Sequence, residues 1–213
     1  MKDRRKDFVR RRFYDYNSSA GFTLIETLVV LGILAMLASI LITYNGSARQ
    51  QDALTIETNK IGQVINLAKS LAMSTYGSGG KFCGYGVYFN INENSDYINS
   101  SSNICGKGID YCIFHYPLPS GDQSCDQVSG FNGITLDNVV AGYVYAMDKS
   151  VKFNNTNSAS NLQSVLFVPP QPEVFLSGVN GELTGSGTIN LISGDGKSSS
   201  VITVSPAGQI SFN

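Results

Sequence analysis

Glu26 is the residue whose chemistry is hardest to reconcile with its neighbours in this chain. It is the single charged side chain between Phe22 and Tyr44, a stretch that is otherwise dominated by apolar residues. A carboxylate near the start of a membrane-spanning helix is costly unless another group pairs with it, so such an acid marks a candidate functional residue. It could equally lie at the membrane interface, where the positive end of the helix dipole favours it. The segment's physics alone leaves both interpretations open.

The cysteines form the second set of residues with chemical potential. In an oxidising exterior an even set of cysteines predicts two disulfides. The spacing contains no C-x-x-C and no histidine cluster accompanies it, which argues against a zinc site. Three pairings are possible. We favour the nested one, because Cys83 begins one expected strand and Cys112 begins its expected hairpin partner. The four residues are Cys83, Cys105, Cys112 and Cys125, nested as Cys83–Cys125 around Cys105–Cys112.

Nothing else in the sequence predicts catalysis. His115 is the only histidine, and its place in an alternating stretch predicts a sheet residue rather than a base. Ser124 and Ser129 have no nearby His–Asp pattern, and G-x-S-x-G does not occur. The glycines within residues 77–80 lack the context of a phosphate loop, and the turn at residues 194–196 lacks the further carboxylates of a calcium site. We expect no enzymatic activity, no cofactor and no bound metal.

Residues 22–44 must form the element that carries Glu26. At about 1.5 Å per residue they make a helix of roughly 34 Å, long enough to cross the hydrocarbon core of a bilayer. Seven Lys and Arg residues precede this stretch and should hold the N-terminus in the cytoplasm by the positive-inside bias. We therefore predict a single-pass cell-membrane protein with an extracytoplasmic C-terminal domain.

The string Gly21-Phe22-Thr23-Leu24-Ile25-Glu26, followed by the apolar run, resembles the prepilin signature of type IV pilins and type II secretion pseudopilins. The resemblance implies that a prepilin peptidase and N-methyltransferase cut after Gly21 and methylate the new N-terminal Phe22. It also implies that Glu26 meets the N-terminal ammonium of a neighbouring subunit inside a filament. The implied partners are other pilin or pseudopilin subunits, an inner-membrane assembly platform and membrane lipid. After assembly the chain would lie in a cell-surface or periplasmic filament.

Residues 1–21 are then a basic cytoplasmic leader that is cleaved. The pair Arg11-Arg12 could instead suggest a twin-arginine export signal, but no A-x-A site follows the apolar run and Glu26 interrupts its start. The leader carries a net charge of +4 and the whole chain −1, which leaves −5 on the mature part before its new amine is counted. An acidic mature part disfavours nucleic-acid binding.

The helix is expected to continue past the membrane as an amphipathic segment over residues 45–76. An apolar stripe at helical spacing supports this, formed by Ile61, Val64, Ile65, Ala68, Leu71 and Ala72. The glycines after Tyr76 should end it, which predicts one helix over residues 23–75. No proline kink is expected, and Asn45-Gly46 are the poorest helix formers along the way.

Residues 81–213 are expected to form an extracytoplasmic β-rich domain, because the pattern changes there to short alternating stretches bounded by turns. Strands are expected at 82–89, 111–116, 134–140, 143–146, 164–168, 174–176, 187–191, 201–204 and 209–212. Short strands at this spacing predict antiparallel pairing. The fold class is therefore α+β, with a long N-terminal helix packed on an antiparallel sheet in the pilin-like manner.

The stretch Ile202-Thr203-Val204-Ser205-Pro206-Ala207-Gly208-Gln209-Ile210 is similar to the closing hairpin of minor pilins and tip-proximal pseudopilins. We predict a non-enzymatic filament subunit, either a minor pilin or a pseudopilin. One alternative is a membrane-anchored ligand-binding module that never polymerises, with its loops at 92–103 and 117–130 forming the binding surface. The other is a minor pilin for DNA uptake, which the scarcity of cations after Lys152 disfavours.

Overall fold

The computed structural model describes residues 21–75, 82–91, 104–117, 125, 136–154, 160–170, 173–178 and 181–213. The expected leader, up to residue 20, and the glycine stretch at 77–80 lie outside these residues. The chain divides into two compact units, Met1–Tyr44 and Asn45–Asn213, which are described separately.

Helix α1 spans Leu24–Thr75 and runs through both units, which confirms the single long helix expected from the sequence. Asn45 and Gly46 lie inside α1 and do not interrupt its backbone. Both residues are weak helix formers, but extending an existing helix through them is easier than starting a new one, so the turns on either side sustain the helical conformation there.

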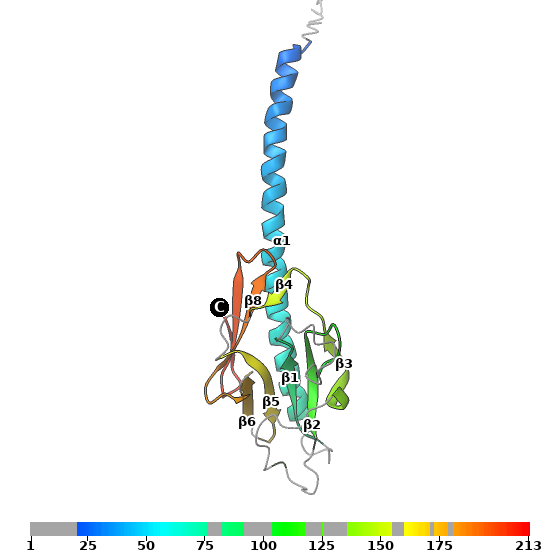
Figure 1. The fold of residues 1–213 in the computed structure, drawn as a ribbon, viewed down its shortest axis with the longest axis vertical. Coiled ribbons are helices and arrows are strands. Elements are labelled where there is room, and N and C mark those ends of the chain that lie inside the picture. Colours follow the sequence, from blue (N-terminus) through cyan, green and yellow to red (C-terminus); the bar gives the residue numbers. More distant parts are fainter. Residues whose placement is uncertain are drawn as a thin grey trace, which may run out of the picture. The chain divides into compact units, whose positions relative to one another are not determined.

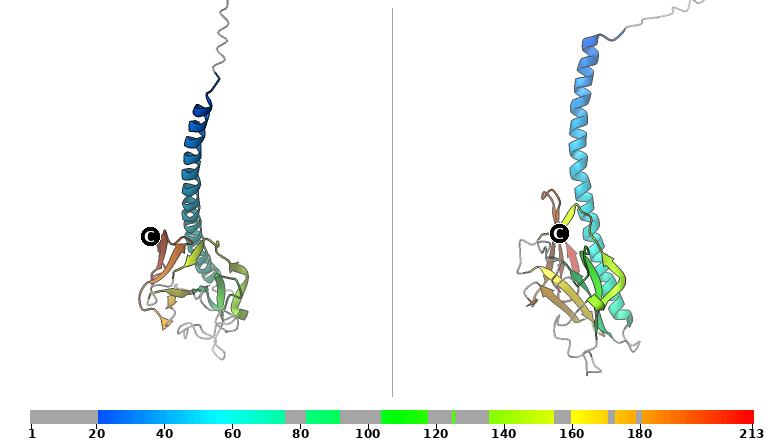
Figure 2. Two further views of the ribbon diagram at one scale, coloured as in Figure 1. Left: turned by 45° about the horizontal axis from the view of Figure 1, so that its top comes forward. Right: turned by 45° about the vertical axis from the view of Figure 1, so that its right-hand side comes forward.

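In the second unit, α1 buries one face against the sheets (Figures 1 and 2). The predicted stripe forms this face, since Ile61, Ile65, Ala68 and Ala72 are fully enclosed and Leu71 is half-buried. The buried face begins earlier than predicted, at Leu54. Its residues recur every three or four positions, which keeps them on one side of a helix with 3.6 residues per turn.

Two antiparallel sheets complete the second unit, so the α+β class is confirmed. The larger sheet has the order β3-β2-β1-β5-β6-β7 and the smaller one the order β10-β9-β8-β4. Every pair of neighbouring named strands is antiparallel. The strands are β1 Phe82–Phe89, β2 Tyr111–Pro117, β3 Val139–Tyr145, β4 Val151–Phe153, β5 Leu162–Val168, β6 Glu173–Gly178, β7 Gly181–Glu182, β8 Gly187–Ser193, β9 Ser199–Val204 and β10 Ile210–Phe212.

The region of β3 differs from the expectation of two strands at 134–140 and 143–146. A 3-10 helix, η1 (Leu136–Asn138), precedes one strand that covers Val139–Tyr145, and residue 134 lies outside the described part. The polar pair Asp137-Asn138 favours local turns over a ladder. Gly142, with φ of 87°, then lets the strand continue through a bend that was read as a gap. Strands β4 and β7 were missed because segments of two or three residues carry no readable alternation.

The two faces of the larger sheet bury different side chains. One face joins α1 and the smaller sheet in the main core, to which β1 contributes Val87 and Phe89. The opposite face carries a second apolar cluster, which we call the disulfide face. Its buried members are Cys83, Tyr88, Cys105, Cys112, Phe114, Leu166 and Val168.

An irregularity in the strand register places Cys83 on the disulfide face. The ladder between β1 and β2 shifts between Phe82 and Gly84, so Cys83 is an extra residue, as in a β-bulge. Strict alternation would place Cys83 on the same face as Tyr85 and Val87, toward α1. The bulge turns it to the opposite face instead.

Gly62 marks a close approach between α1 and strand β10. A Cβ added at this buried helical position would lie 2.5 Å from Cζ and 2.9 Å from Cε1 of Phe212. Glycine inside a helix costs about 1 kcal/mol relative to alanine. The ring of Phe212 fills the space that a side chain at Gly62 would need, which explains why the costly residue is present.

We predict that Gly62→Ala changes the sign of its effect with residue 212. In the natural chain the new methyl group collides with Phe212, so the free energy of unfolding should fall, by about 1–3 kcal/mol. In a Phe212→Ala background the collision is absent, and the same change should raise the free energy of unfolding by about 1 kcal/mol. Denaturant unfolding of the four chains in detergent would measure this. The same sign in both backgrounds would contradict the contact.

Candidate functional site

The first turn of α1 is built around Thr23. Its hydroxyl Oγ1 accepts a hydrogen bond from the backbone N–H of Glu26, with 3.3 Å between the heavy atoms. Its carbonyl oxygen accepts from the backbone N–H groups of Glu26 and Thr27, at 3.0 and 3.2 Å. Thr23 is therefore the N-cap of the helix and Glu26 occupies the third helical position. The sequence reasoning missed this cap, although the pattern S/T-x-x-E signals it.

This cap fixes where the Glu26 carboxylate lies. The side chain is exposed in the first turn of α1, where the unsatisfied N–H groups and the helix dipole favour a negative charge. Within the described part of the chain, no hydrogen bond or ion pair engages its carboxylate oxygens. Glu26 is thus held at the helix N-terminus by its backbone, with its carboxylate open to a group from outside the described residues.

The helix beyond Glu26 is apolar and uncovered. Leu24–Ile42 is long and apolar enough to cross a membrane, and none of that window is buried inside the first unit. Exposed side chains there include Leu31 and Leu41, at 66% and 62% exposure. An apolar surface of this length is not stable in water, so it requires lipid or the apolar surfaces of other chains. The helix fits a membrane anchor with a C-terminal domain.

Comparison with known protein families gives one match, to the prokaryotic N-terminal methylation motif, over residues 16–42. The matched segment contains Gly21, Phe22, Glu26 and the apolar span. The chain therefore carries the N-terminal signature of type IV pilin-like and pseudopilin-like proteins. That motif implies processing by a prepilin peptidase and assembly with other pilin-type subunits. No curated protein and no solved structure matches the chain.

The four cysteines form two disulfides, Cys83–Cys125 and Cys105–Cys112. This is the nested pairing favoured from the sequence. Cys112 lies in β2, next to Tyr88 of β1 in the ladder, and Cys105 lies in the segment that precedes β2. Both bridges belong to the disulfide face, where they close loops over a cluster of buried side chains. The two disulfides cross-link the β domain and are distant in sequence from Glu26 and the first turn of α1.

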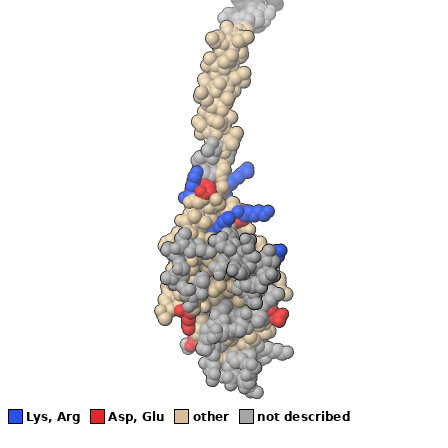
Figure 3. Space-filling view, in the orientation of Figure 1, with Lys and Arg blue, Asp and Glu red and all other residues tan. Residues whose placement is uncertain are grey.

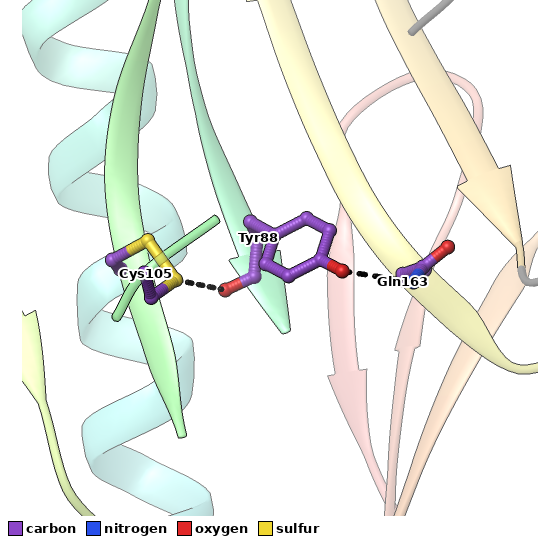
Figure 4. Close-up of a disulfide and its surroundings, with 4 residues drawn as sticks. Tyr88, Cys105 and Gln163 are labelled. Atoms are coloured by element: carbon purple, nitrogen blue, oxygen red, sulfur yellow. Dashed lines mark hydrogen bonds between the residues drawn. A yellow bond between two sulfur atoms is a disulfide. The ribbon is translucent and has the colours of Figure 1, made fainter. Parts of the chain in front are cut away.

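Tyr88 links the Cys105–Cys112 bridge to the neighbouring strand (Figure 4). The Cys105 sulfur lies 3.8 Å from the Tyr88 carbonyl oxygen, which is a close contact because a disulfide sulfur has no hydrogen to donate. The Tyr88 hydroxyl accepts a hydrogen bond of 3.0 Å from Nε2 of Gln163. Gln163 is the extra residue of a register shift in β5, between Leu162 and Ser164. Burial raises the pKa of Tyr88, and the bond from Gln163 opposes this.

The remaining candidates do not assemble into a reactive site. His115 lies in β2 with its ring centroid 3.9 Å from that of Phe82, and burial lowers its pKa. Asp195 accepts hydrogen bonds from Ser193 and Lys197 within its own turn. Ser124 and Ser129 lie outside the described residues. Within the described ranges, no group of three or more His, Cys, Asp or Glu side chains could hold a metal ion.

The sequence did not predict two buried polar side chains, Glu57 and Tyr111. Glu57 in α1 is 6% exposed, and its Oε1 pairs with Lys60 Nζ at 3.3 Å, while Oε2 has no hydrogen-bond partner among the described residues. Tyr111 in β2 is fully buried, and no described residue makes a hydrogen bond to its hydroxyl. Burial, and then the charge of Glu57, raise the pKa of Tyr111 well above its ordinary value. Glu57 falls on the buried face four residues before Ile61, so the extended stripe was the signal that could have placed it.

We predict that Tyr111 makes stability fall at alkaline pH. Because its pKa is higher in the folded chain than in the unfolded one, its contribution is complete below about pH 10 and is lost as pH rises above that value. Tyr111→Phe removes this titration, so its free energy of unfolding should decline less between about pH 10 and pH 12. At neutral pH the variant should be unchanged or more stable by about 1 kcal/mol, because no hydroxyl is left without a partner.

Denaturant unfolding of the full chain in detergent, at stepwise pH, measures both effects. Tyr145→Phe is the comparison, because Tyr145 stacks on Tyr111 with 5.1 Å between ring centroids yet is more exposed. Burial raises the pKa of Tyr145 as well, so this variant should lessen the alkaline decline, but by less than Tyr111→Phe. An identical alkaline decline in the natural chain and in Tyr111→Phe would contradict the assignment.

Proposed function

We propose that this chain is a structural subunit, a minor pilin or a pseudopilin, of a type IV pilus or a type II secretion pseudopilus. In this proposal residues 1–21 are removed as a cytoplasmic leader and the new N-terminal Phe22 is methylated. Residues 22–44 anchor the precursor in the membrane and later pack in the filament core. Residues 45–76 continue the helix, and residues 81–213 form the extracytoplasmic domain.

A single observation carries the proposal: an exposed apolar helix that begins with the methylation motif. The motif match covers residues 16–42, and the span Leu24–Ile42 has none of its residues buried. A hydrocarbon bilayer and the packed helices of a filament core are both apolar, so transfer of this helix between them is close to neutral in hydrophobic terms. Helix packing and polar pairs must then decide assembly.

Glu26 is the polar group that we propose favours assembly of the helix into the filament. Its carboxylate is exposed at the start of the span and has no partner among the described residues. After cleavage a second subunit would offer an ammonium group on Phe22, four residues before its own Glu26. An unpaired charge in an apolar core is strongly unfavourable, whereas a paired one fixes the register of two helices. Glu26 would thus select one axial position for each incoming subunit.

Neither alternative function has an observation in its favour. An anchored binding module would use loops at 92–103 and 117–130, most of which lie outside the described residues. DNA uptake would require a positively charged surface, and the mature part carries a net charge of −5. The state of the N-terminus separates a filament subunit from an anchored module, because only the former requires a processed Phe22.

The proposal is tested by the mass of the N-terminal peptide in sheared surface filaments and in membranes. We expect the filament fraction to contain a peptide that begins at methylated Phe22. Gly21→Glu should block cleavage, so the variant should remain in membranes with its leader attached. Protein confined to membranes with residues 1–20 still present would overturn the proposal and favour the anchored module.

We predict that Glu26→Ala lowers incorporation into filaments by roughly tenfold or more, because a buried ammonium left without its partner costs about 3–5 kcal/mol. Membrane insertion and leader cleavage should be largely intact, since neither depends on the pair. The measurement compares the amount of processed protein in sheared filaments with that in membranes. Leu28→Ala, which shortens another exposed side chain of the same helix without removing a charge, is the control. Equal incorporation of Glu26→Ala and the natural chain would refute the pairing.

A further inference from the structure

The second unit bears exposed cations near the start of its part of α1. Arg49 lies seven residues beyond Ile42, the last residue of the span, on the same continuous helix. At about 1.5 Å per residue this is about 10 Å of helix. Arg49 is exposed, so its guanidinium is held by the chain itself within reach of the surface of any bilayer that the span crosses.

Two turns carry further cations to the same level of α1. The turn between β8 and β9 is attached to the helix, because the backbone N–H of Asp195 donates to Gln50 Oε1 at 3.2 Å and Gln51 Nε2 donates to Ser198 Oγ at 3.4 Å. This turn carries Lys197, which is exposed. Gln50 and Gln51 directly follow Arg49, so these bonds hold the turn that carries Lys197 at the same level of α1 as Arg49.

The turn before β4 joins this group. The backbone N–H of Gly194 donates to the Ser150 carbonyl oxygen at 2.6 Å, and Lys149 precedes Ser150 in an exposed position. We call Arg49, Lys149 and Lys197 the basic rim. Lys and Arg side chains project at this end of the second unit in Figure 3.

Exposed acids accompany the rim, and the two in its turns are hydrogen-bonded within those turns. Asp195 Oδ1 accepts from Ser193 Oγ at 2.6 Å and from the Lys197 N–H at 3.1 Å, while Asp148 Oδ1 accepts from the N–H and hydroxyl of Ser150. These bonds hold one oxygen of each carboxylate within its own turn. Asp52 is a third, exposed acid on α1. Among the residues that the structure describes, no ion pair engages a rim cation.

We propose that the basic rim binds the phosphate groups of anionic phospholipids while the apolar helix anchors the chain in the membrane. This inference rests on the proposed membrane-anchored precursor. Lys and Arg side chains are long enough to reach headgroup phosphates, whereas the short aspartates stay in their turns. Each cation near an anionic surface favours the bound state by about fivefold. The anchor keeps the rim at high effective concentration near the lipid, which adds to the weak attraction of each cation.

The chain contains no tryptophan, so one introduced indole reports on a single place. Ser199→Trp places it at the exposed start of β9, beside the rim. Ala207→Trp is the distant control, in a turn whose Gly208 carbonyl accepts from Lys69 Nζ at 3.3 Å. Lys69 lies nineteen residues beyond Gln50 in α1, or about 28 Å along the helix. Each full-length chain is placed in nanodiscs of phosphatidylglycerol or of phosphatidylcholine, with a trace of nitroxide-headgroup lipid as quencher.

We expect quenching of Ser199→Trp to be at least about twofold stronger in phosphatidylglycerol than in phosphatidylcholine, and to weaken at high salt. Lys149→Gln with Lys197→Gln should abolish the difference. Lys69→Gln with Lys107→Gln removes the same charge elsewhere and should preserve it. Ala207→Trp should show no dependence on the lipid.

Equal quenching of Ser199→Trp in the two lipids would overturn the inference, as would a difference that survives the loss of both rim lysines. A difference seen only in discs that hold several copies would assign the rim to contacts between subunits and would also overturn it. Failure of the chain to enter discs at all would refute the membrane anchor, and with it the proposed function. The two failures are therefore distinguishable.

Discussion

The constraint on which this structure depends is that one uninterrupted helix must satisfy two environments. From Leu24 to Ile42 α1 is apolar all round, as a helix in lipid or in a bundle of helices must be. From Leu54 to Ala72 it is apolar on one face only, because the other face meets water while the sheets cover the first. The change from one pattern to the other occurs without a break in the hydrogen-bonded backbone. The β domain therefore packs only on the second part of α1, and the apolar first part takes no part in its core.

Charge along α1 follows the same division. In the first part the described helix has one charged residue, Glu26, and the helix geometry places it at the capped end, where a negative charge is least costly. In the second part a buried acid, Glu57, pairs with Lys60 one turn later, while its other carboxylate oxygen and the Tyr111 hydroxyl have no hydrogen-bond partner among the described residues. The two acids illustrate opposite solutions. The Glu26 carboxylate is exposed at the helix end, and the Glu57 carboxylate is buried within the fold.

Sequence reasoning reached the features that repeat and missed those that depend on a single residue. The long helix, its buried stripe and most strands follow from periodicity, which averages over many positions. The cap by Thr23 was written in the sequence as S/T-x-x-E but was read only as part of a larger motif. The burial of Glu57 and the packing of Phe212 on Gly62 depend on tertiary contacts between distant segments, which local pattern does not record. Strands β4 and β7 are defined by the neighbours they pair with rather than by their own sequences.

The bulge in β1 determines which disulfides can form, because it shifts the alternation of side chains between the two faces of the sheet. Alternation along a strand assigns side chains to faces by parity, and the extra residue between Phe82 and Gly84 reverses that parity for everything before it. In a regular ladder that kept Cys83 two positions before Tyr85, the Cys83 sulfur would point into the main core, and Cys125 would have no partner on the disulfide face. Such a change in register would alter the covalent connectivity of the domain while leaving its composition unaltered. Homologous chains with the same cysteines but a different count in β1 would therefore have to pair them differently or realign the strand.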